Sequence, residues 1–505
     1  MLEREKGVKN IRKQITEPFV SKQRVFLILV VTIVTITIVS KSSPLYPFND
    51  GVDVNAFMTM GRSLLYGKVP YKDLYDHKGP FLYVIYLTAV LISETSFIGV
   101  WLWEIVACFF FLLFSYKIIE DCSKTLSLLF IPVLAAVVYG SAAFLNGGLV
   151  EEFSLPIFAY AIYIGFEMLD DKRQLKNSSS LIIGITSGIL FWMKFNLCMF
   201  YLGWIFAIAC VFIKRHRIKE LIKMCFLILA GIVLVTVPLI IYFAANNGLN
   251  DLFKVYFYDN MFTYSEADNR TLFKIIKNIF VGFESNIIWN LASCIYTLVG
   301  LIFLFIHSKR KFLLTVCSFL SMGVGIYCGM RSSSYYTIAF SVFAPLIMES
   351  VRNLKLKDNE QRFLQKNKKY IIAFLSIVSI LFIYINSPNI YLMKYKKTDM
   401  PQFQFAEIIS NVEDATLLEY DCMDLGFYTA CGIVPVSKYY YKPNMEINEL
   451  YEEQKEIIEN GSVDFIVAMD ELDADLYKCV ASADFLFWDG GDYTNHYYLY
   501  QLITD

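Results

Sequence analysis

The sequence predicts a polytopic α-helical membrane protein that carries a small α/β domain at its C-terminal end. Hydrophobic residues make up 56% of the 505 residues and charged residues only 18%, whereas a soluble chain carries roughly a quarter. Uncharged runs such as VFLILVVTIVTITIV and FLILAGIVLVTVPLIIYF approach the ~20 residues with which a helix crosses a bilayer. The net charge of −2 gives no indication of a nucleic-acid partner, and we expect none.

About eleven apolar segments are expected to be transmembrane helices. These segments are 25–41, 97–117, 125–142, 153–169, 180–194, 197–213, 221–244, 286–306, 312–329, 335–350 and 370–386. Lys and Arg gather in every second connection, as in KRHRIKE and HSKRK. Because short cytoplasmic loops hold the excess of these residues, the pattern predicts a multi-pass cell-membrane protein with a cytoplasmic N-terminus and an extracytoplasmic C-terminus.

Residues 42–96 are predicted to form one large outside loop with two interfacial helices. The segment 80–92 has about 13 residues, too few to cross the membrane, and a crossing there would place every later basic connection outside. We therefore expect it to lie in the outer leaflet. The segment 53–66 has apolar residues at helical spacing, the pattern of a helix resting on the membrane surface.

The composition changes after residue 386. Residues 1–386 are predicted to form the transmembrane domain, and residues 387–505 alternate helix-like and strand-like patterns at ordinary soluble polarity. About 110 residues suffice for a small α/β domain, which we expect outside. The eleven cysteines include no C-x-x-C pair, so no structural zinc site is expected. Whether Cys422 and Cys431 form a disulfide stays open.

The first outside loop places carboxylates and cations at the starts of its two helices. Asp50 and Asp53 open the first helix, and His77 and Lys78 precede the second. A carboxylate can take a proton from an acceptor hydroxyl, and a cation at a helix N-terminus suits an anion such as phosphate. The residues alone equally allow Asp53 to be an N-cap and Lys78 to be an interface anchor. His77 is a candidate phosphate or acceptor contact.

Further polar candidates stand at the outer ends of later segments. Arg331 is the cation of an outside loop, where the distribution of Lys and Arg disfavours one, and is therefore a candidate phosphate ligand. Lys194 lies between two short apolar segments and is either a second such ligand or a snorkelling side chain. The candidate sugar or acceptor contacts are Glu151, Glu152, Tyr258, Asn260 and Tyr264.

Two charged residues are expected to have structural roles. Arg62 follows a glycine in the first loop, and we expect it to brace that loop against Asp73 or Asp76. Glu104 lies in the outer half of an apolar segment, where an interhelical hydrogen bond would satisfy it.

The stretch DVNAFMTMGRSLLYGKVPYKDLYDHKGPFLY (53–83) resembles the first outside loop of bacterial GT-C membrane glycosyltransferases. It is most similar to the glycosyltransferase family 39-like group, which includes protein mannosyltransferases and the aminoarabinose transferase of lipid A. NGGLVEEFSLP (146–156) is similar to a second outside loop of this group. The resemblance implies a GT-C-like transmembrane domain with interfacial helices in the first loop.

The resemblance also implies an activity. Enzymes of this group transfer a sugar from a polyprenyl-phosphate donor at the outer face, so we expect inverting hexosyl or pentosyl transfer to a cell-envelope glycan, lipid or protein. Asp53 matches the acidic residue that opens the family loop, and Lys78, Gly79 and Pro80 match its turn. The chain departs from the lipid A enzyme at Val54, where that enzyme has a second acidic residue. The base is therefore assigned to Asp53, with Asp50 as the alternative.

Two other functions are compatible with parts of the sequence. A transporter or flippase of lipid-linked sugars would share the membrane segments, but such proteins commonly carry polar groups near the membrane midplane, whereas here they cluster at the outer ends. A receptor built around the C-terminal domain would not need Asp53 or Lys78. No cofactor is expected from the sequence, and the participation of a divalent cation stays open.

The predicted topology can be tested with a reporter fused after Asp505. A reporter that is active only in the cytoplasm should give no signal, because the C-terminal domain is expected outside. An active reporter would instead mean that 80–92 crosses the membrane.

Overall fold

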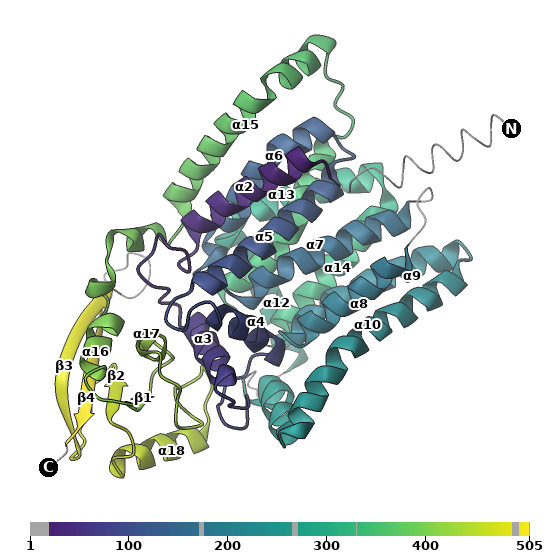
Figure 1. Cartoon of the computed structure of the whole chain (residues 1–505). Coiled ribbons are helices and arrows are strands. Elements are labelled where there is room, and N and C mark those ends of the chain that lie inside the picture. The colour runs from purple at the N-terminus through teal and green to yellow at the C-terminus, as the bar shows by residue number, and fades with distance from the viewer. Residues whose placement is uncertain (1–19, 171–175, 265–270, 330, 487–493, 504–505) are drawn as a thin grey trace.

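The computed structural model describes residues 20–170, 176–264, 271–329, 331–486 and 494–503. A large bundle of helices fills most of the molecule, and a small sheet with short helices lies at one end of it, with α17 between the sheet and α3 (Figure 1). The turn between α9 and α10 lies at the opposite end.

The bundle contains helices of very different lengths. Its elements are α2 (Lys22–Val39), α3 (Val52–Leu65), α4 (Pro80–Val90), α5 (Ile98–Ile119), α6 (Lys124–Tyr139), η1 (Ala142–Phe144), α7 (Val150–Leu169), α8 (Asn177–Phe191), η2 (Phe195–Cys198), α9 (Met199–Lys214), α10 (Ile218–Ala245), α11 (Leu249–Asp251), the π-helix η3 (Leu252–Thr263), α12 (Leu272–Trp289), α13 (Leu291–His307), α14 (Lys309–Tyr327), the 3₁₀-helix η5 (Ser334–Val351) and α15 (Asp358–Asn386). Within the described ranges, six helical segments are long and apolar enough to cross a membrane, or seven if one bent pair counts as a single span. The structure therefore shows a polytopic helical protein, and the number of eleven spans stays a prediction.

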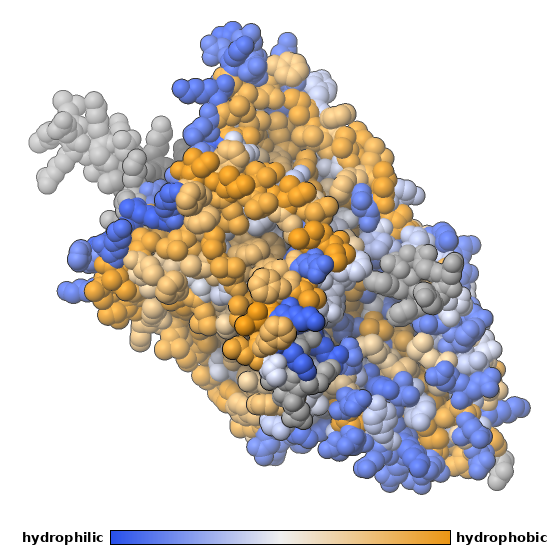
Figure 2. Space-filling model, turned by 180° about the vertical axis from the view of Figure 1, so that it is seen from behind, coloured by the Kyte–Doolittle hydropathy of each residue, from blue (hydrophilic) through white to orange (hydrophobic). Residues whose placement is uncertain are grey.

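The surface of the bundle is apolar enough for a bilayer. Figure 2 shows a broad hydrophobic band with hydrophilic residues at its two ends. Large apolar side chains on the surface of the bundle face outward, including Phe226 on α10 and Ile385 on α15, which are 69% and 78% exposed. Contiguous apolar surface of this extent is unusual on a soluble monomer, so the helices fit a lipid environment.

One apolar segment that was predicted to be a single straight helix is bent in the structure. The apolar run 286–306 was expected to be a single helix, but α12 and α13 meet at Asn290 with a bend of 109°. Asn290 donates hydrogen bonds to the carbonyl of Thr337 and to Ser341 Oγ. The amide nitrogen of Asn290 therefore has two partners inside the bundle, at a break that the apolar pattern does not reveal.

Both predicted helices of the first loop are present, but α3 does not rest on a membrane surface as expected. Ten consecutive residues, from Val54 to Ser63, are buried. α3 packs against α4, and Gly61 allows this because an added Cβ would lie 2.7 Å from the backbone carbon of Tyr86. An apolar stripe of this kind packs equally well on protein, and here protein also covers the polar residues between Val54 and Ser63.

The turn before α4 lies directly against the joint between α8 and α9. Gly79 N donates to the carbonyl of Met193, and Phe81 N donates to that of Trp192. A Cβ at position 79 would overlap the carbonyl group of Trp192, so only glycine permits this approach. Pro80 occupies the first turn of α4, where its missing N–H costs no helical hydrogen bond. The turn thus fixes Lys78 next to the joint that carries Lys194.

The C-terminal part forms a four-stranded mixed sheet with short helices. Its elements are η6 (Ile390–Lys394), η7 (Lys397–Asp399), α16 (Pro401–Ile409), β1 (Leu417–Glu419), α17 (Phe427–Cys431), α18 (Asn448–Glu459), β2 (Phe465–Ala468), β3 (Tyr477–Leu486) and β4 (Thr494–Leu502). The strand order is β1-β2-β4-β3, with β1 parallel to β2 and the other pairs antiparallel. The predicted mixture of helices and strands after residue 386 is therefore present.

Buried polar contacts join α3 to the C-terminal part. Arg62 donates to the carbonyls of Tyr428 and Ile433 at 3.0 and 3.2 Å, and also to the carbonyl of Glu94. The expectation that Arg62 braces the loop through Asp73 or Asp76 is therefore wrong, because its guanidinium binds backbone carbonyls instead.

A second contact lies one turn earlier on the same helix. Thr59 Oγ1 donates to Asp424 Oδ2 at 2.7 Å, and burial raises the pKa of Asp424 to about 6. Both contacts hold the polar side of α3 away from solvent.

The substitution Gly79→Ala should destabilise the protein, because the new methyl group would push the turn off the carbonyl of Trp192. We expect a cost of about 1–3 kcal/mol, measured as a lower unfolding temperature of the detergent-solubilised protein. Gly329→Ala is the matched control, since its Cβ would meet nothing within 4 Å. Equal unfolding temperatures for the two variants would contradict the tight docking of this turn.

Candidate active site

The structure brings Asp53, His77 and Lys78 together at the end of the bundle that carries the sheet. Lys78 Nζ lies 3.0 Å from His77 Nε2 and 3.9 Å from Asp53 Oδ1. Tyr335 Oη donates to Asp53 Oδ2 at 3.2 Å. These side chains line a cavity of about 200 Å³, and the Asp53 side chain keeps 27% of its surface exposed. Asp53 is thus held by one hydrogen bond and one ion pair and is open to a ligand.

The interpretation of Asp53 as an N-cap is wrong. Gly51 is the N-cap of α3 and Val52 its first residue, so Asp53 lies inside the first turn. A carboxylate at this position interacts favourably with the helix dipole, worth roughly 0.3–1 kcal/mol. Its carboxylate faces Lys78 and Tyr335, which capping does not require.

His77 is neutral and receives a hydrogen bond from Lys78. Burial lowers the pKa of His77 well below its ordinary value, and the nearby cations lower it further. Since an ammonium group can only donate, Nε2 must be the unprotonated nitrogen, and the proton sits on Nδ1, which faces Asp76 Oδ1 at 3.6 Å. The His77 ring also stacks on Tyr264 with centroids 4.9 Å apart. The imidazole therefore orients Lys78 and adds no positive charge.

Lys78 keeps its charge despite being enclosed. Burial alone would lower the pKa of the ammonium group, but nearby negative groups, Asp53 first among them, outweigh burial and raise it above the ordinary value. Asp76 behaves differently, since burial raises the pKa of its carboxyl group. The positive charge of Lys78 is thus retained in the wall of the Asp53 cavity.

A second cavity of about 200 Å³ adjoins the first and collects the predicted phosphate ligands. Lys78, Lys194 and Arg331 all line it, together with His77 and Tyr264, which belong to the first cavity as well. The remaining wall comes from the α8–α9 joint, the end of α14, η3 and the start of η5. The arrangement concentrates positive charge where the helical bundle meets the Asp53 cavity, which suits a phosphate group.

Each of the two added cations is positioned by a specific contact. Lys194 Nζ forms an ion pair with Glu151 Oε1 at 2.6 Å and lies 4.0 Å from the centre of the Tyr336 ring. Arg331 Nε donates to the carbonyl of Tyr264 at 3.0 Å, and its guanidinium lies over the ring of the same residue. Lys194 is therefore not a snorkelling side chain at the lipid surface, because its partners belong to the site.

The two adjacent glutamates have separate environments. Glu151 reaches the cation cavity through Lys194. Glu152 is buried in the bundle, where its Oε2 accepts a hydrogen bond from Gly148 N. Glu104 accepts a hydrogen bond from Ser40 on a neighbouring segment, which confirms the expected interhelical contact. Neither Glu151 nor Glu152 is among the residues that line the two cavities.

The three candidates on and after η3 also differ. Asn260 donates to the carbonyl of His77 at 2.6 Å and so holds the loop. Tyr264 lines both cavities. Tyr258 is 57% exposed and lines a larger cavity of about 1090 Å³ beside the C-terminal part.

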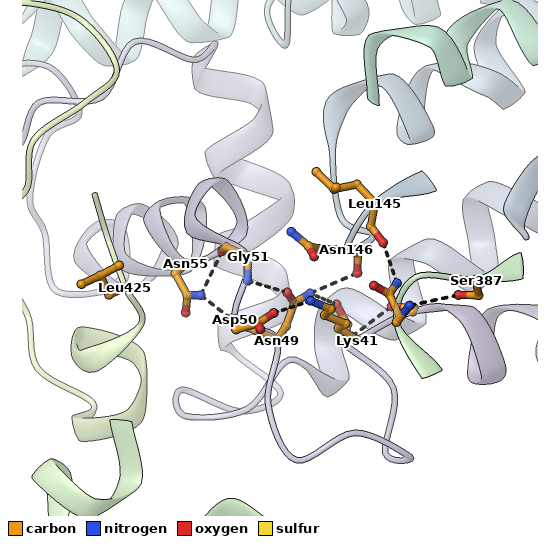
Figure 3. A network of polar contacts seen from close by, with 12 residues as sticks. Lys41, Asn49, Asp50, Gly51, Asn55, Leu145, Asn146, Ser387 and Leu425 are labelled. Carbon is orange, nitrogen blue, oxygen red and sulfur yellow. Dashed lines mark hydrogen bonds and ion pairs between the residues drawn. The ribbon is translucent and has the colours of Figure 1, made fainter. Parts of the chain in front are cut away.

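Asp50, the alternative base, is tied into a separate polar network (Figure 3). Its Oδ1 forms an ion pair with Lys41 Nζ at 2.7 Å. In the same network Asn49 Oδ1 accepts from Gly51 N, and Asn55 Nδ2 donates to the carbonyls of Asn49 and Gly51. The network fixes the start of α3, and Asp50 contributes to it through its pair with Lys41.

Several residues that line the site were not predicted from the sequence. Tyr335 and Tyr441 line the Asp53 cavity, as do Met423, Pro443 and Asn444. The adjacent pair Tyr335 and Tyr336 directly after SSS was a usable signal, because tyrosines beside a lone cation suit ligand binding. The C-terminal residues carried no such signal.

Two further features of the described residues concern metal ligands and cysteines. No group of three or more His, Cys, Asp or Glu side chains that could hold a metal ion occurs among the residues described. All eleven cysteines are free thiols, including Cys422 and Cys431.

The fold and the cavities define a polytopic helical membrane protein with a cation-rich cavity at one end of its bundle. Its structure is similar to two crystal structures of ArnT from Cupriavidus metallidurans. The structure bound to undecaprenyl phosphate matches with a TM-score of 0.58 at 10% identity, and the apo structure with 0.56 at 8%. Each match covers 94% of this chain and 97% of the other. The chain therefore has the GT-C-like fold that its first loop led us to expect.

Sequence comparison adds nothing to this likeness. No protein-family model matches the chain, and no curated protein matches it.

Proposed function

We propose that this protein is a membrane glycosyltransferase that transfers a sugar from a polyprenyl-phosphate donor to an envelope acceptor at the outer face of the membrane. The single observation that carries the proposal is the meeting of a partly exposed carboxylate, Asp53, with a cavity lined by Lys78, Lys194 and Arg331. The fold it shares with ArnT, one structure of which holds undecaprenyl phosphate, supports the lipid-linked donor.

The cations suit the leaving group. In this proposal the donor phosphate binds in the cation cavity, with its polyprenyl chain directed toward the apolar helices. Negative charge grows on the phosphate as its bond to the sugar breaks, and fixed cations stabilise that charge more in the transition state than in the ground state. His77 holds the Lys78 ammonium in place.

Asp53 suits the role of base. It takes the proton of the acceptor hydroxyl, whose oxygen then forms a bond to the anomeric carbon while the phosphate leaves with the electron pair of the broken bond. Attack from the face opposite the phosphate inverts the configuration of that carbon. Tyr335 donates a hydrogen bond to the carboxylate, and the ammonium group of Lys78 lies 3.9 Å from it, so that both groups hold it at the boundary between the two cavities.

The site does not support the alternative function as a transporter or flippase. The charged groups lie at the end of the bundle that carries the C-terminal sheet. Transporters built from structural repeats commonly place such groups near the membrane midplane, at the interface of the repeats.

The role of the cations predicts the effect of Lys78→Met and Arg331→Met. Each replacement keeps much of the side-chain length and removes a charge from the leaving-group site. We expect turnover to fall roughly 10²-fold or more for each, measured with purified protein, a polyprenyl-phosphate sugar and a matched acceptor. Undiminished transfer with both residues replaced would assign the phosphate to Lys194 or to a metal ion.

The role of Asp53 predicts that Asp53→Asn is severely impaired. Asparagine has nearly the same shape but cannot accept the proton, so the rate should fall ~10²-fold or more while the protein stays folded and inserted. If Asp53 acted only on the helix dipole, the loss would be confined to a small decrease in stability.

Asp50→Asn is the control for this experiment. It removes a carboxylate three residues earlier in the chain, and we expect it to weaken the contact with Lys41 while leaving the base intact. A fully active Asp53→Asn beside an inactive, folded Asp50→Asn would move the base to Asp50. Full activity of both variants would refute a catalytic role for this loop.

A further inference from the structure

A groove with a volume of about 1090 Å³ separates η3 from the loops of the C-terminal part. One wall is formed by η3, and the other by residues 421–423 and 442–446. The groove shares Arg331 with the cation cavity. It also shares Met423, Pro443 and Asn444 with the Asp53 cavity. The groove is therefore contiguous with both halves of the site.

The η3 wall presents aromatic rings. Tyr258 and Phe262 are 57% and 49% exposed, and their ring centroids lie 4.9 Å apart. Aromatic rings exposed in this way present negatively polarised faces, onto which the C–H groups of a sugar ring can pack.

The opposite wall combines charged groups with apolar side chains, among them Met423, Met445 and Met469. Lys442 Nζ forms an ion pair with Asp421 Oδ1 at 2.6 Å, and both side chains keep a third or more of their surface exposed. Lys442 N donates to the carbonyl of Cys422 at 2.7 Å, which holds the two loops together. Charged groups in such a wall form stronger hydrogen bonds to hydroxyl groups than neutral ones do.

The size and position of the groove indicate the class of ligand. Pockets for drug-sized molecules range from about 300 to 1,000 Å³, so the groove has room for more than one sugar unit. The cation cavity is lined by residues of the bundle, those of η3 included, whereas the groove adds the loops of the C-terminal part on its other side. A lipid acceptor would need a wholly apolar wall, whereas Asp421, Lys442 and Glu446 place charged groups along this one.

We propose that this groove binds the acceptor and that the acceptor is an oligosaccharide or polysaccharide strand. The inference rests on the proposed glycosyltransferase function and adds the substrate class to it. The strand lies between the rings of η3 and the loops of the C-terminal part, and its terminal hydroxyl reaches Asp53 past Pro443 and Asn444. The donor then enters from the bundle and the acceptor from the opposite side.

The test uses envelope polysaccharide purified from a strain in which the gene for this protein is deleted. The full-length, detergent-solubilised protein is titrated against this immobilised polysaccharide, and in parallel against undecaprenyl phosphate. The double variant Tyr258→Ala/Phe262→Ala should bind the polysaccharide at least 10-fold more weakly than the wild type. Its affinity for undecaprenyl phosphate should be unchanged, which also shows that the variant is folded.

Phe253→Ala is the matched control. Phe253 lies on the same helix and is 52% exposed, but it is not among the residues that line the groove. We expect its affinity for the polysaccharide to equal that of the wild type.

Other outcomes distinguish a failure of glycan binding in the groove from a failure of donor binding. Equal binding by all variants, or no binding of the polysaccharide by the wild type, would overturn the proposal. The same holds for binding only to vesicles of envelope lipid or only to peptides. If the polysaccharide binds as expected but the wild type does not bind undecaprenyl phosphate, the groove stands as a glycan-binding site and the proposed transfer reaction fails.

Discussion

The contact of a backbone turn with a backbone joint determines the geometry of the whole site. Gly79 and Phe81 donate to the carbonyls at the α8–α9 joint, and the absence of a side chain at Gly79 makes this approach sterically feasible. The residues on either side of the contact are Lys78 and Lys194, which line the same cavity. Two like charges are thereby held near each other by rigid backbone and not by long flexible side chains alone.

The charges of Lys78 and Lys194 have partners before any ligand arrives. Lys194 has Glu151, and Lys78 has Asp53 together with the lone pair of the neutral His77. Burying an unpaired charge is costly, so these partners make an enclosed cationic cavity compatible with a stable fold. The separation of 3.9 Å between Lys78 and Asp53 is long for an ion pair, which leaves both groups available to other partners.

The sequence was sufficient for features that depend on local pattern. Apolar runs predicted the helices of the bundle, and the resemblance of the first loop to GT-C enzymes led to the expectation that Asp53 and Lys78 belong to a site, which stays a prediction. Contacts between distant segments were out of reach, because Tyr335 and Asp53 are 282 residues apart and no local pattern links them. The break at Asn290 was missed because the surrounding run is uniformly apolar, and the burial of α3 because an apolar stripe packs on protein as well as on lipid.

The link between Arg62 and the C-terminal part has a consequence for biosynthesis. The guanidinium is buried and donates to the carbonyl of Tyr428, 366 residues further along the chain. Chains are synthesised at roughly 5–20 residues per second, so this interval corresponds to tens of seconds. During that time α3 has left the ribosome, but the Arg62 guanidinium still lacks its final hydrogen-bond partners. The first loop therefore reaches its final packing only after the last quarter of the chain has been made and has folded against it, and a ribosome that stops early releases a chain with an exposed, incomplete site.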